Sequence, residues 1–504
     1  MTAPRAMMTI FGHSRSLDGS SSPRGSAVRP PAPQTAPPSK FPVATERNTV
    51  VHVFLLGGIL AAAVFAQGGM IPEIWLGCEL AIGLLVTTWA VSEKVTTGVA
   101  RSTRVFPKAI LALPLYAVCQ TIPLPLYVVE ALSPSRVALQ QAVSVLAPDA
   151  AGWTAISAHP DQTVTLALRL AAYGGVFWIA RGATFRLGKY AFAIAAPIIV
   201  IAALQAAIVL HVGEGQRGEE HGGAGQASAG SYVNRNHLAG LLEMALPFAA
   251  VAFGVFIWPV GRLRRRGLSA VGAAVSGAFA LVIVAGLLAT RSRAGLVAAL
   301  ASLFVLGLIA AARAARPQRL AGAIVLPLLL GAAFIYLPSD NLVRRYGALV
   351  GATNLHREGR VALWRETVDL IAAYPLVGCG FGAYESVFLS YKRSAPMVND
   401  AHAHNDYLEL QAEAGLIGFA ICVMLAGRLI LGALRASLGN NPRRQMALAA
   451  ACMGSLTAIL VHSFVDFNLR IPANGMVLFW VLGVSAACGD SAVKRSEDTA
   501  ETSS

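Results

Sequence analysis

Long runs of apolar residues, separated by short polar segments, occupy most of this chain. A helix that crosses a lipid bilayer needs about 20 predominantly apolar residues. The runs that approach this length predict twelve spanning helices, over residues 48–66, 72–91, 109–129, 163–180, 190–211, 236–258, 268–289, 294–312, 320–337, 407–428, 445–466 and 472–488. The third run contains Pro114, Pro123 and Pro125, so we expect it to be kinked or to lie partly in the interface. The pattern predicts an all-α, polytopic membrane protein.

One long polar segment, residues 338–406, interrupts this pattern between the ninth and tenth predicted helices. Its middle part, residues 360–374, carries apolar residues near helical spacing and stops before Pro375, which predicts an amphipathic helix. The glycine-rich sequence 378–382 follows and predicts a turn. We therefore expect a partly helical loop that lies as a small cap on the membrane surface.

Composition and charge agree with a membrane protein and set its orientation. The 504 residues are 55% hydrophobic and only 13% charged, and the mean hydropathy of +0.60 excludes an ordinary soluble domain. The net charge of +14 comes from Lys and Arg residues that gather in alternate loops, for example 262–266 and 313–319. The positive-inside rule places these loops and both termini in the cytoplasm and 338–406 on the outer side. No basic run is interleaved with aromatic residues, so nucleic-acid binding is not expected.

Both ends of the chain are predicted to be disordered cytoplasmic tails. Residues 1–47 are rich in Pro, Ser, Ala and Arg and have no apolar core, and residues 489–504 form a second, short polar end. The membrane domain is therefore expected over residues 48–488, with 338–406 as its periplasmic loop.

A first cluster of polar residues begins where the chain re-enters the membrane, at His404 and Asn405. On a helix, His404, Gly415 and Gly418 share one face, and small residues there let another helix approach closely. A neutral imidazole at this position is suited to take a proton from a hydroxyl nucleophile. Two alternatives stay open. In the first alternative, His404 and Asn405 only cap the helix. In the second, Asp400, His402 and His404 bind a metal ion, although a firm third ligand is missing.

A second cluster consists of arginines at the predicted outer boundary. Arg291 and Arg293 share a very short turn, and Arg235 precedes His237 at the start of a span. Arginine makes forked bonds to phosphate oxygens and stays charged in poorly hydrated sites, which fits an anionic lipid headgroup or a pyrophosphate. The alternative is ordinary snorkelling to lipid phosphates. Arg169, within the fourth span, fits either interpretation.

A third cluster runs from His462 to Gly475, across the end of one predicted helix and a short turn. Asp466 in this cluster is predicted to pair with Arg470 or with an arginine of another loop, and so to hold that arginine in place. The alternative is a purely structural network that satisfies the turn.

At these residues the chain resembles the bacterial O-antigen ligase and O-antigen polymerase family. The ligase pattern is His, then Asn, Ser or Gln, nine residues, Gly, two residues, and Gly, Thr or Tyr. It is met by His404, Asn405, Gly415 and Gly418. The twelve spans with a large outer loop before the tenth also match, as do the segments around 236–237, 291–295, 360–380, 462–468 and 471–474.

The resemblance implies a membrane glycosyltransferase of the bacterial inner membrane, without metal or cofactor. A glycan on undecaprenyl pyrophosphate would pass to an acceptor hydroxyl of a lipid A core or a growing polysaccharide, with inversion. His404 would be the base and Arg291, Arg293 and Arg235 the pyrophosphate ligands. The positioning residues would be His237, Arg360, Asn405 and Asp466.

Two other classes of function are consistent with a polytopic membrane protein. A transporter, for bicarbonate or another small solute, would carry broken helices and an ionisable site near the bilayer midplane. A scaffold subunit of an envelope complex would tolerate loss of His404.

Overall fold

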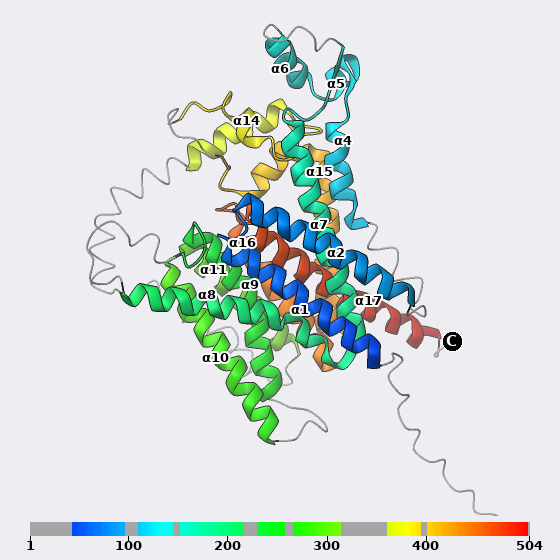
Figure 1. Cartoon of the computed structure of the whole chain (residues 1–504), viewed down its shortest axis with the longest axis vertical. Helices are drawn as coiled ribbons and strands as arrows, with labels where there is room; N and C mark the ends of the chain where they lie inside the picture. The colour runs from blue at the N-terminus through cyan, green and yellow to red at the C-terminus, as the bar shows by residue number, and fades with distance from the viewer. Residues whose placement is uncertain are drawn as a thin grey trace, which may run out of the picture. The chain divides into compact units, whose positions relative to one another are not determined.

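Helices make up nearly all of the structure, a computed structural model that describes residues 43–95, 109–144, 152–215, 229–257, 266–313, 360–394 and 401–501 (Figure 1). Ten helices in these ranges are long and apolar enough to cross a membrane. They are α1 (Val43–Phe65), α2 (Pro72–Val95), α7 (Pro160–Leu187), α8 (Ala196–Gly215), α9 (Arg235–Ile257), α10 (Arg266–Thr290), α11 (Arg293–Ala312), α15 (Asp406–Leu438), α16 (Arg443–His462) and α17 (Pro472–Glu501). The prediction of an all-α polytopic membrane protein is confirmed.

The third predicted span, 109–129, is not one helix. Helix α4 (Ala112–Thr121) ends before Pro123, because proline disfavours helical backbone in the residue before it and Ile122 is extended there. Residues Leu124–Pro125 form the short strand β1, which pairs with β2 (Trp153–Thr154), and two short helices lie between them, α5 (Leu126–Leu132) and α6 (Pro134–Ser144). The prediction of a full span was therefore wrong, while the expectation of an interruption at the prolines was right.

Three other predicted segments need comment. The ninth predicted span, 320–337, and residues 1–42 of the predicted tail 1–47 lie outside the described residues. The tail prediction was wrong for residues 43–47, which belong to helix α1. The expected C-terminal tail from residue 489 overlaps α17, which continues as a helix to Glu501. A short 3-10 helix, η2 (Gly188–Ala195), joins α7 to α8 and another, η5 (Asn468–Arg470), lies between α16 and α17.

Helix α17 is the most enclosed span. Of its 18-residue apolar window 94% is buried by protein, compared with 72% for α16 and 22% each for α10 and α15. Small residues allow this enclosure: Gly483 of α17 faces the backbone of Phe177 in α7 so closely that a methyl group would not fit. The peripheral helices expose apolar side chains such as Leu281 and Met424, as lipid contact requires.

The polar residues gather where α1 and α16 end and α9, α15 and α17 begin. The Ala473 N–H donates to the Gly68 carbonyl at 2.9 Å, and the Asp406 N–H donates to the Ser463 carbonyl at 2.9 Å. These bonds join the ends of four helices. We call this region the polar end of the bundle.

Helix α15 is broken at Gly415, which has φ 60° and ψ −170°. Backbone groups that the break releases bond to the loop segment 375–380 instead. The bonds run from Cys379 N to Ala412 O (2.9 Å), Gly380 N to Glu413 O (3.1 Å), Leu416 N to Pro375 O (2.8 Å) and Ile417 N to Leu376 O (3.1 Å). The loop thereby supplies the hydrogen bonds that a membrane helix otherwise makes within itself.

Gln120 of α4 forms hydrogen bonds both to the loop segment and to the broken part of α15. Its side-chain amide donates to the carbonyls of Val377 (2.8 Å) and Glu413 (3.0 Å) and accepts from the Phe381 N–H (3.0 Å). Gln120 is buried, so these bonds satisfy polar groups in a place without water. Helix α4, the loop and α15 therefore form one connected unit.

The predicted cap is present in the described part of the loop. Residues 360–373 are helical, the glycine-rich turn follows, and α14 (Tyr384–Phe388) packs on the same apolar cluster as Leu363 and Leu370. Positive φ angles at Gly378 (75°) and Gly380 (109°) let the turn approach the broken helix.

The expectation that Gly415 and Gly418 admit a packing helix was wrong at Gly415. The backbone of loop residues 376–378, and not a helix, lies against Gly415. Gly418 faces the ring of Tyr116 in α4, whose Cε1 atom would lie 2.6 Å from an added Cβ.

Candidate functional site

Asp466 joins three polar side chains from different parts of the chain at the polar end. Its Oδ2 atom accepts a hydrogen bond from Asn236 Nδ2 at 2.7 Å. Its Oδ1 atom lies 3.4 Å from His404 Nδ1 and 3.7 Å from His237 Nε2. We call Asp466, Asn236, His237 and His404 the Asp466 cluster. The cluster brings together three of the residues that the sequence singled out, although up to 230 positions separate them.

The carboxyl group of Asp466 stays ionised although it is buried. Burial alone would raise its pKa, but the facing imidazoles of His237 and His404 and the Phe467 N–H hold the pKa well below the ordinary value of 3.8. The side chain of Asp466 is 1% exposed and that of His404 is 29% exposed. The arrangement is a fixed, buried anion behind an accessible imidazole.

The backbone at His404 adopts a left-handed conformation. Three non-glycine residues of the described ranges have positive φ: Gln67 (57°), Arg291 (55°) and His404 (48°). Such conformations cost roughly 1–3 kcal/mol and persist only where the surroundings fix them, often at functional sites. For two of the three, Arg291 and His404, the sequence predicts a role in the chemistry.

A second cluster surrounds Arg470, at the end of η5. Arg470 Nε lies 2.8 Å from Glu409 Oε1, and Arg470 Nη2 donates to Glu413 Oε2 at 2.5 Å. Glu409 also contacts His402 Nδ1 at 2.8 Å and accepts from the Ala403 N–H at 2.9 Å. We call Arg470, Glu409, Glu413 and His402 the Arg470 cluster.

The charges of the Arg470 cluster stabilise one another. Burial would lower the pKa of Arg470, but the carboxylates of Glu413 and Glu409 raise it above its ordinary value. Burial likewise lowers and the Glu409 carboxylate raises the pKa of His402, with a net increase above 6.5. The predicted pairing of Asp466 with Arg470 was wrong, since the Arg470 guanidinium pairs with two carboxylates of α15 instead.

The ring of Phe467 lies between the two clusters. It stacks on His402 with the ring centroids 4.2 Å apart, and it meets His237 and His404 edge-on at 4.6 and 4.8 Å. The apolar Phe467 side chain therefore separates the His404 imidazole from the ion pairs of the Arg470 cluster.

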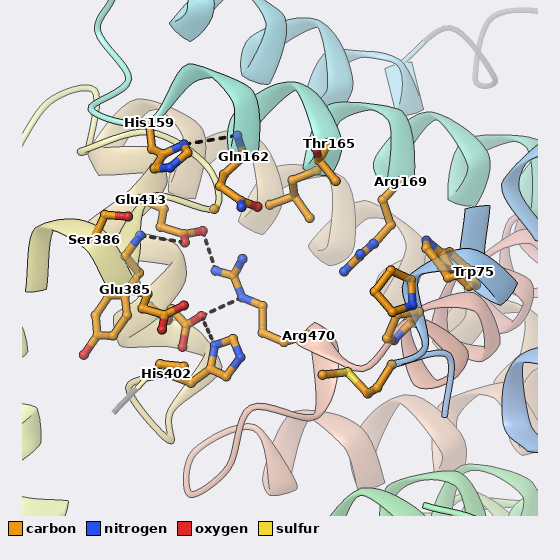
Figure 2. A pocket seen from close by; sticks show the side chains of 18 of the residues that line it. Trp75, His159, Gln162, Thr165, Arg169, Glu385, Ser386, His402, Glu413 and Arg470 are labelled. Atoms are coloured by element: carbon orange, nitrogen blue, oxygen red, sulfur yellow. Dashed lines mark hydrogen bonds and ion pairs between the residues drawn. The ribbon is translucent and has the colours of Figure 1, made fainter. Parts of the chain in front are cut away.

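A cavity of about 280 Å³ opens beside the Arg470 cluster (Figure 2). It is lined by Gly69, Met70, Pro72, Trp75, His159, Gln162, Thr165, Leu166, Arg169, Gly382, Tyr384, Glu385, Ser386, Ala401, His402, Glu409, Glu413, Arg470 and Pro472. Figure 2 shows Arg169 beside Trp75 at one end, Glu385 and Ser386 at the other, and Arg470 between them. Many of the lining side chains are polar or charged, which favours a polar ligand over a hydrophobic one.

The predicted pyrophosphate ligands do not line this cavity. Arg291 and Arg293 flank Ser292, which caps α11, and both arginines are exposed at the turn between α10 and α11. The turn reaches the polar end through Gly295, which packs against Ala239 and Glu243 of α9.

Two further predicted residues lie at the ends of described helices. Arg235 is exposed at the first residue of α9, next to Asn236 of the Asp466 cluster. Arg360 is half-buried at the first described residue of the cap helix, and no hydrogen bond or ion pair of the described ranges joins it to Asp466.

Asn405 caps α15, as one of the alternatives from the sequence proposed. Its side-chain oxygen accepts from the N–H groups of Tyr407 (3.0 Å) and Leu408 (3.1 Å), and its amide donates to the Phe464 carbonyl at 3.0 Å. The capping interpretation thus holds for Asn405, whereas the His404 side chain faces Asp466.

The proposed metal set of Asp400, His402 and His404 finds no support. Asp400 lies outside the described residues, and within the described ranges no three His, Cys, Asp or Glu side chains are grouped so as to hold a metal ion.

Sequence reasoning gave no role to several buried ionisable residues near the site. Glu243 of α9 contacts His462 of α16 at 3.0 Å, with both side chains fully buried. Glu409 and Glu413 lie four positions apart in α15 and therefore on one helix face, which is the signal that was available for a common partner. The sequence does not show towards which acidic residues the Arg470 side chain points.

Comparison with known proteins supports the likeness drawn from the motifs. Residues 278–423 match the family described as O-antigen ligase. This segment includes α11, the cap helix, the glycine-rich turn, His404 and the break in α15.

The chain is also 26% identical over 133 residues to the exopolysaccharide production protein ExoQ of Rhizobium meliloti (strain 1021). The alignment covers 25% of this chain, which thus spans about 30% of that relative's length.

Proposed function

From the premise that this chain is a membrane protein of the O-antigen ligase family, we propose that it transfers a glycan from undecaprenyl pyrophosphate to an acceptor hydroxyl. The observation that carries the proposal is the Asp466 cluster, in which an ionised carboxylate lies 3.4 Å from Nδ1 of the accessible His404. A carboxylate facing Nδ1 favours the tautomer with its proton there, which leaves Nε2 as the acceptor. This is the arrangement of a general base with an orienting group behind it.

The proposed reaction is a single displacement. Nε2 of His404 takes the proton of the acceptor hydroxyl as its oxygen bonds to the anomeric carbon. The bond between that carbon and the pyrophosphate oxygen breaks, and undecaprenyl pyrophosphate leaves with the electron pair. Attack opposite the leaving group inverts the anomeric centre. His404 then releases its proton to solvent.

Pyrophosphate is a good leaving group, so it needs positive charge more than a proton donor. We assign this role to Arg291, Arg293 and Arg235. The left-handed backbone of Arg291 and the packing of its turn against α9 support the assignment, because they fix the turn at the polar end. No metal or cofactor takes part in the proposed reaction.

The remaining residues position the reactants. Asp466 orients His404, and His237 contacts the same carboxylate. Asn405 fixes the start of α15 directly after His404. Arg360, in the cap helix, is assigned to contacts with the glycan.

We place the protein in a bacterial inner membrane with both termini in the cytoplasm and the polar end at the periplasmic face. The basic loops on the opposite side support this orientation. The acceptor is a lipid A core sugar or a second lipid-linked glycan, and a deletion strain separates the two. Loss of all attached polymer would indicate a ligase, and loss of length alone a polymerase.

The direct test uses purified protein in lipid nanodiscs with a glycan on undecaprenyl pyrophosphate and, in separate reactions, core oligosaccharide or a second lipid-linked glycan as the acceptor. We expect a glycosylated acceptor and an equal amount of released undecaprenyl pyrophosphate, both measured by mass spectrometry. Failure to transfer to core oligosaccharide and to lipid-linked acceptor alike would refute the proposal.

A solute transporter remains the second candidate because one observation favours it. Helix α15 is broken at Gly415, next to buried ionisable residues, and transporters place substrate at such breaks. Flux of bicarbonate into proteoliposomes without any glycan transfer would favour the transporter. In the present structure the loop 375–380 already occupies the backbone groups of the break, which argues for a structural role.

A further inference from the structure

We propose that the cavity of Figure 2 binds one sugar ring that carries a carboxylate, and that Arg169 is the cation that pairs with it. The inference rests on the proposed function, and it names the class of glycan that the protein recognises. None of the residues assigned above to the base or to the pyrophosphate lines this cavity.

Arg169 lies inside the span α7 and forms no ion pair with any described residue. Its Nε atom is buried and has no hydrogen-bond partner among the described residues. Its guanidinium lies 5.8 Å from the centroid of the Trp75 ring. The Arg169 charge acts on the carboxylate of Glu79, but that carboxylate accepts a hydrogen bond from Trp75 Nε1 at 2.6 Å, and the two residues form no ion pair. A charged side chain in a membrane span is costly, which makes a ligand the natural partner.

The other guanidinium of the cavity is not available for a ligand. Arg470 is already neutralised by Glu409 and Glu413, whose side chains are each 1% exposed. A second anion at Arg470 would meet these carboxylates at short range. An anionic ligand is therefore directed to the end of the cavity where Arg169 lies.

The remaining wall suits a carbohydrate. Gln162 and Thr165 of α7 and Ser386 of α14 expose neutral polar groups that exchange hydrogen bonds with hydroxyls. The volume of about 280 Å³ lies just below the roughly 300–1,000 Å³ range of ligand pockets. Such a space fits one ring rather than an oligosaccharide. Arg169 at one end then selects rings with a carboxylate.

The cavity lies apart from the proposed base, so sugar binding in the cavity is separate from the proton transfer at His404. His402 lines the cavity and stacks on Phe467, whose opposite contacts are His237 and His404. A ring bound in the cavity is thus separated from the proposed base by the side chains of His402 and Phe467. We assign the cavity to a sugar that neighbours the reacting one, so that it contributes to specificity and not to bond formation.

The test measures binding without transfer. Protein in nanodiscs of neutral phosphatidylcholine, in a phosphate-free buffer, is titrated with glucuronic acid and with glucose by saturation-transfer NMR. We expect glucuronate to bind at least about tenfold more tightly than glucose, which corresponds to about 1.4 kcal/mol. Equal affinity for the two sugars would overturn the inference without any variant.

Variants then locate the contact. Arg169→Gln should reduce the affinity for glucuronate to that for glucose, and Arg169→Lys should restore part of the difference. Arg393→Gln removes an arginine that is 75% exposed and outside the cavity, and it should bind like the parent protein. Undiminished glucuronate binding by Arg169→Gln would refute the role of Arg169.

Inorganic phosphate distinguishes a carboxylate site from a phosphate site. If phosphate displaces glucuronate at lower concentration than glucuronate itself binds, the cavity is a phosphate subsite and the inference fails. Loss of selectivity with glycan transfer intact would remove only this inference. Selective binding without any transfer would remove only the proposed function.

Discussion

The two clusters at the polar end place carboxylates beside nitrogen bases in opposite ways. In the Asp466 cluster one carboxylate serves an amide and two imidazoles, and His404 remains 29% exposed. In the Arg470 cluster two carboxylates, each 1% exposed, enclose one guanidinium. The first arrangement leaves a proton acceptor at the surface, and the second leaves no charge unpaired.

The difference shows that two largely buried charges in the turn between α16 and α17 differ in how completely their partners neutralise them. Asp466 and Arg470 are four residues apart, with Phe467 between them. A single anion behind an accessible imidazole leaves the other ring nitrogen available, which fits the base proposed above. A buried ion-pair network in which every charge has a partner stabilises the fold. Removing one partner leaves the remaining charges buried and uncompensated.

The largest expected effect is on catalysis, at His404. His404→Ala should lower kcat for glycan transfer by about 10²–10⁴-fold, the usual contribution of a general base. Protein yield and Tm should change little, because the side chain is partly exposed. His211→Ala, an exposed histidine at the end of α8, is the matched control. Surface glycan at parental levels in cells that carry His404→Ala would remove the base from the mechanism.

The second effect is on stability, at Arg470. Arg470→Gln leaves Glu409 and Glu413 buried without their partner, so we expect a loss of about 3–5 kcal/mol. Thermal unfolding in detergent measures it. The exposed pair of Arg393 with Asp369 is the control, and Arg393→Gln should cost no more than about 1 kcal/mol. Replacing both glutamates by glutamine as well should recover much of the loss. A stable Arg470→Gln protein would mean that the network is not structural.

A smaller effect separates orientation from proton transfer, at Asp466. Asp466→Asn should lower kcat by roughly 10–100-fold, as loss of an orienting carboxylate commonly does. KM should stay nearly constant, and Asp466→Glu should restore part of the rate. Because the pKa of Asp466 lies below 3.8, its ionised form is retained above that pH and is lost only as the pH falls through the lower folded value. An increase in KM with constant kcat would indicate substrate binding instead.

The smallest effect is a pH dependence at His402. Its pKa is raised above 6.5 by Glu409, so the stabilisation by this pair is complete below pH 6.5 and is lost as the pH rises through the raised value. The Tm of the parent protein should therefore decrease by about 2 °C as the pH rises from below 6.5 to above the raised pKa of His402. His402→Gln should remove this dependence, and His211→Gln should preserve it. A parent Tm that rises over the same range would contradict the assignment.

The sequence was sufficient for the spans and for part of the site. Length and apolar character alone predict helices such as α9 and α17, because the bilayer fixes both requirements. The sequence singled out His237, His404 and Asp466 in three separate polar clusters, and the structure brings them together.

The sequence was insufficient where partners are distant and the backbone is irregular. Arg470 lies 57 positions from Glu413, and only the direction of η5 decides which acid it meets. The break at Gly415 depends on hydrogen bonds from residues 375–380, which no local pattern reveals. The apolar run at 109–129 is long enough to span, yet its prolines divide it.

The interrupted helix α15 also constrains how the protein is made. Its first segment has no complete set of internal bonds, so it is not a stable membrane element until residues 375–380 and Gln120 have docked. Folding of the preceding loop and completion of α15 are therefore coupled, because each supplies hydrogen-bond partners that the other lacks. A cut of the chain within 375–380 is therefore expected to destabilise α15 as well as the loop.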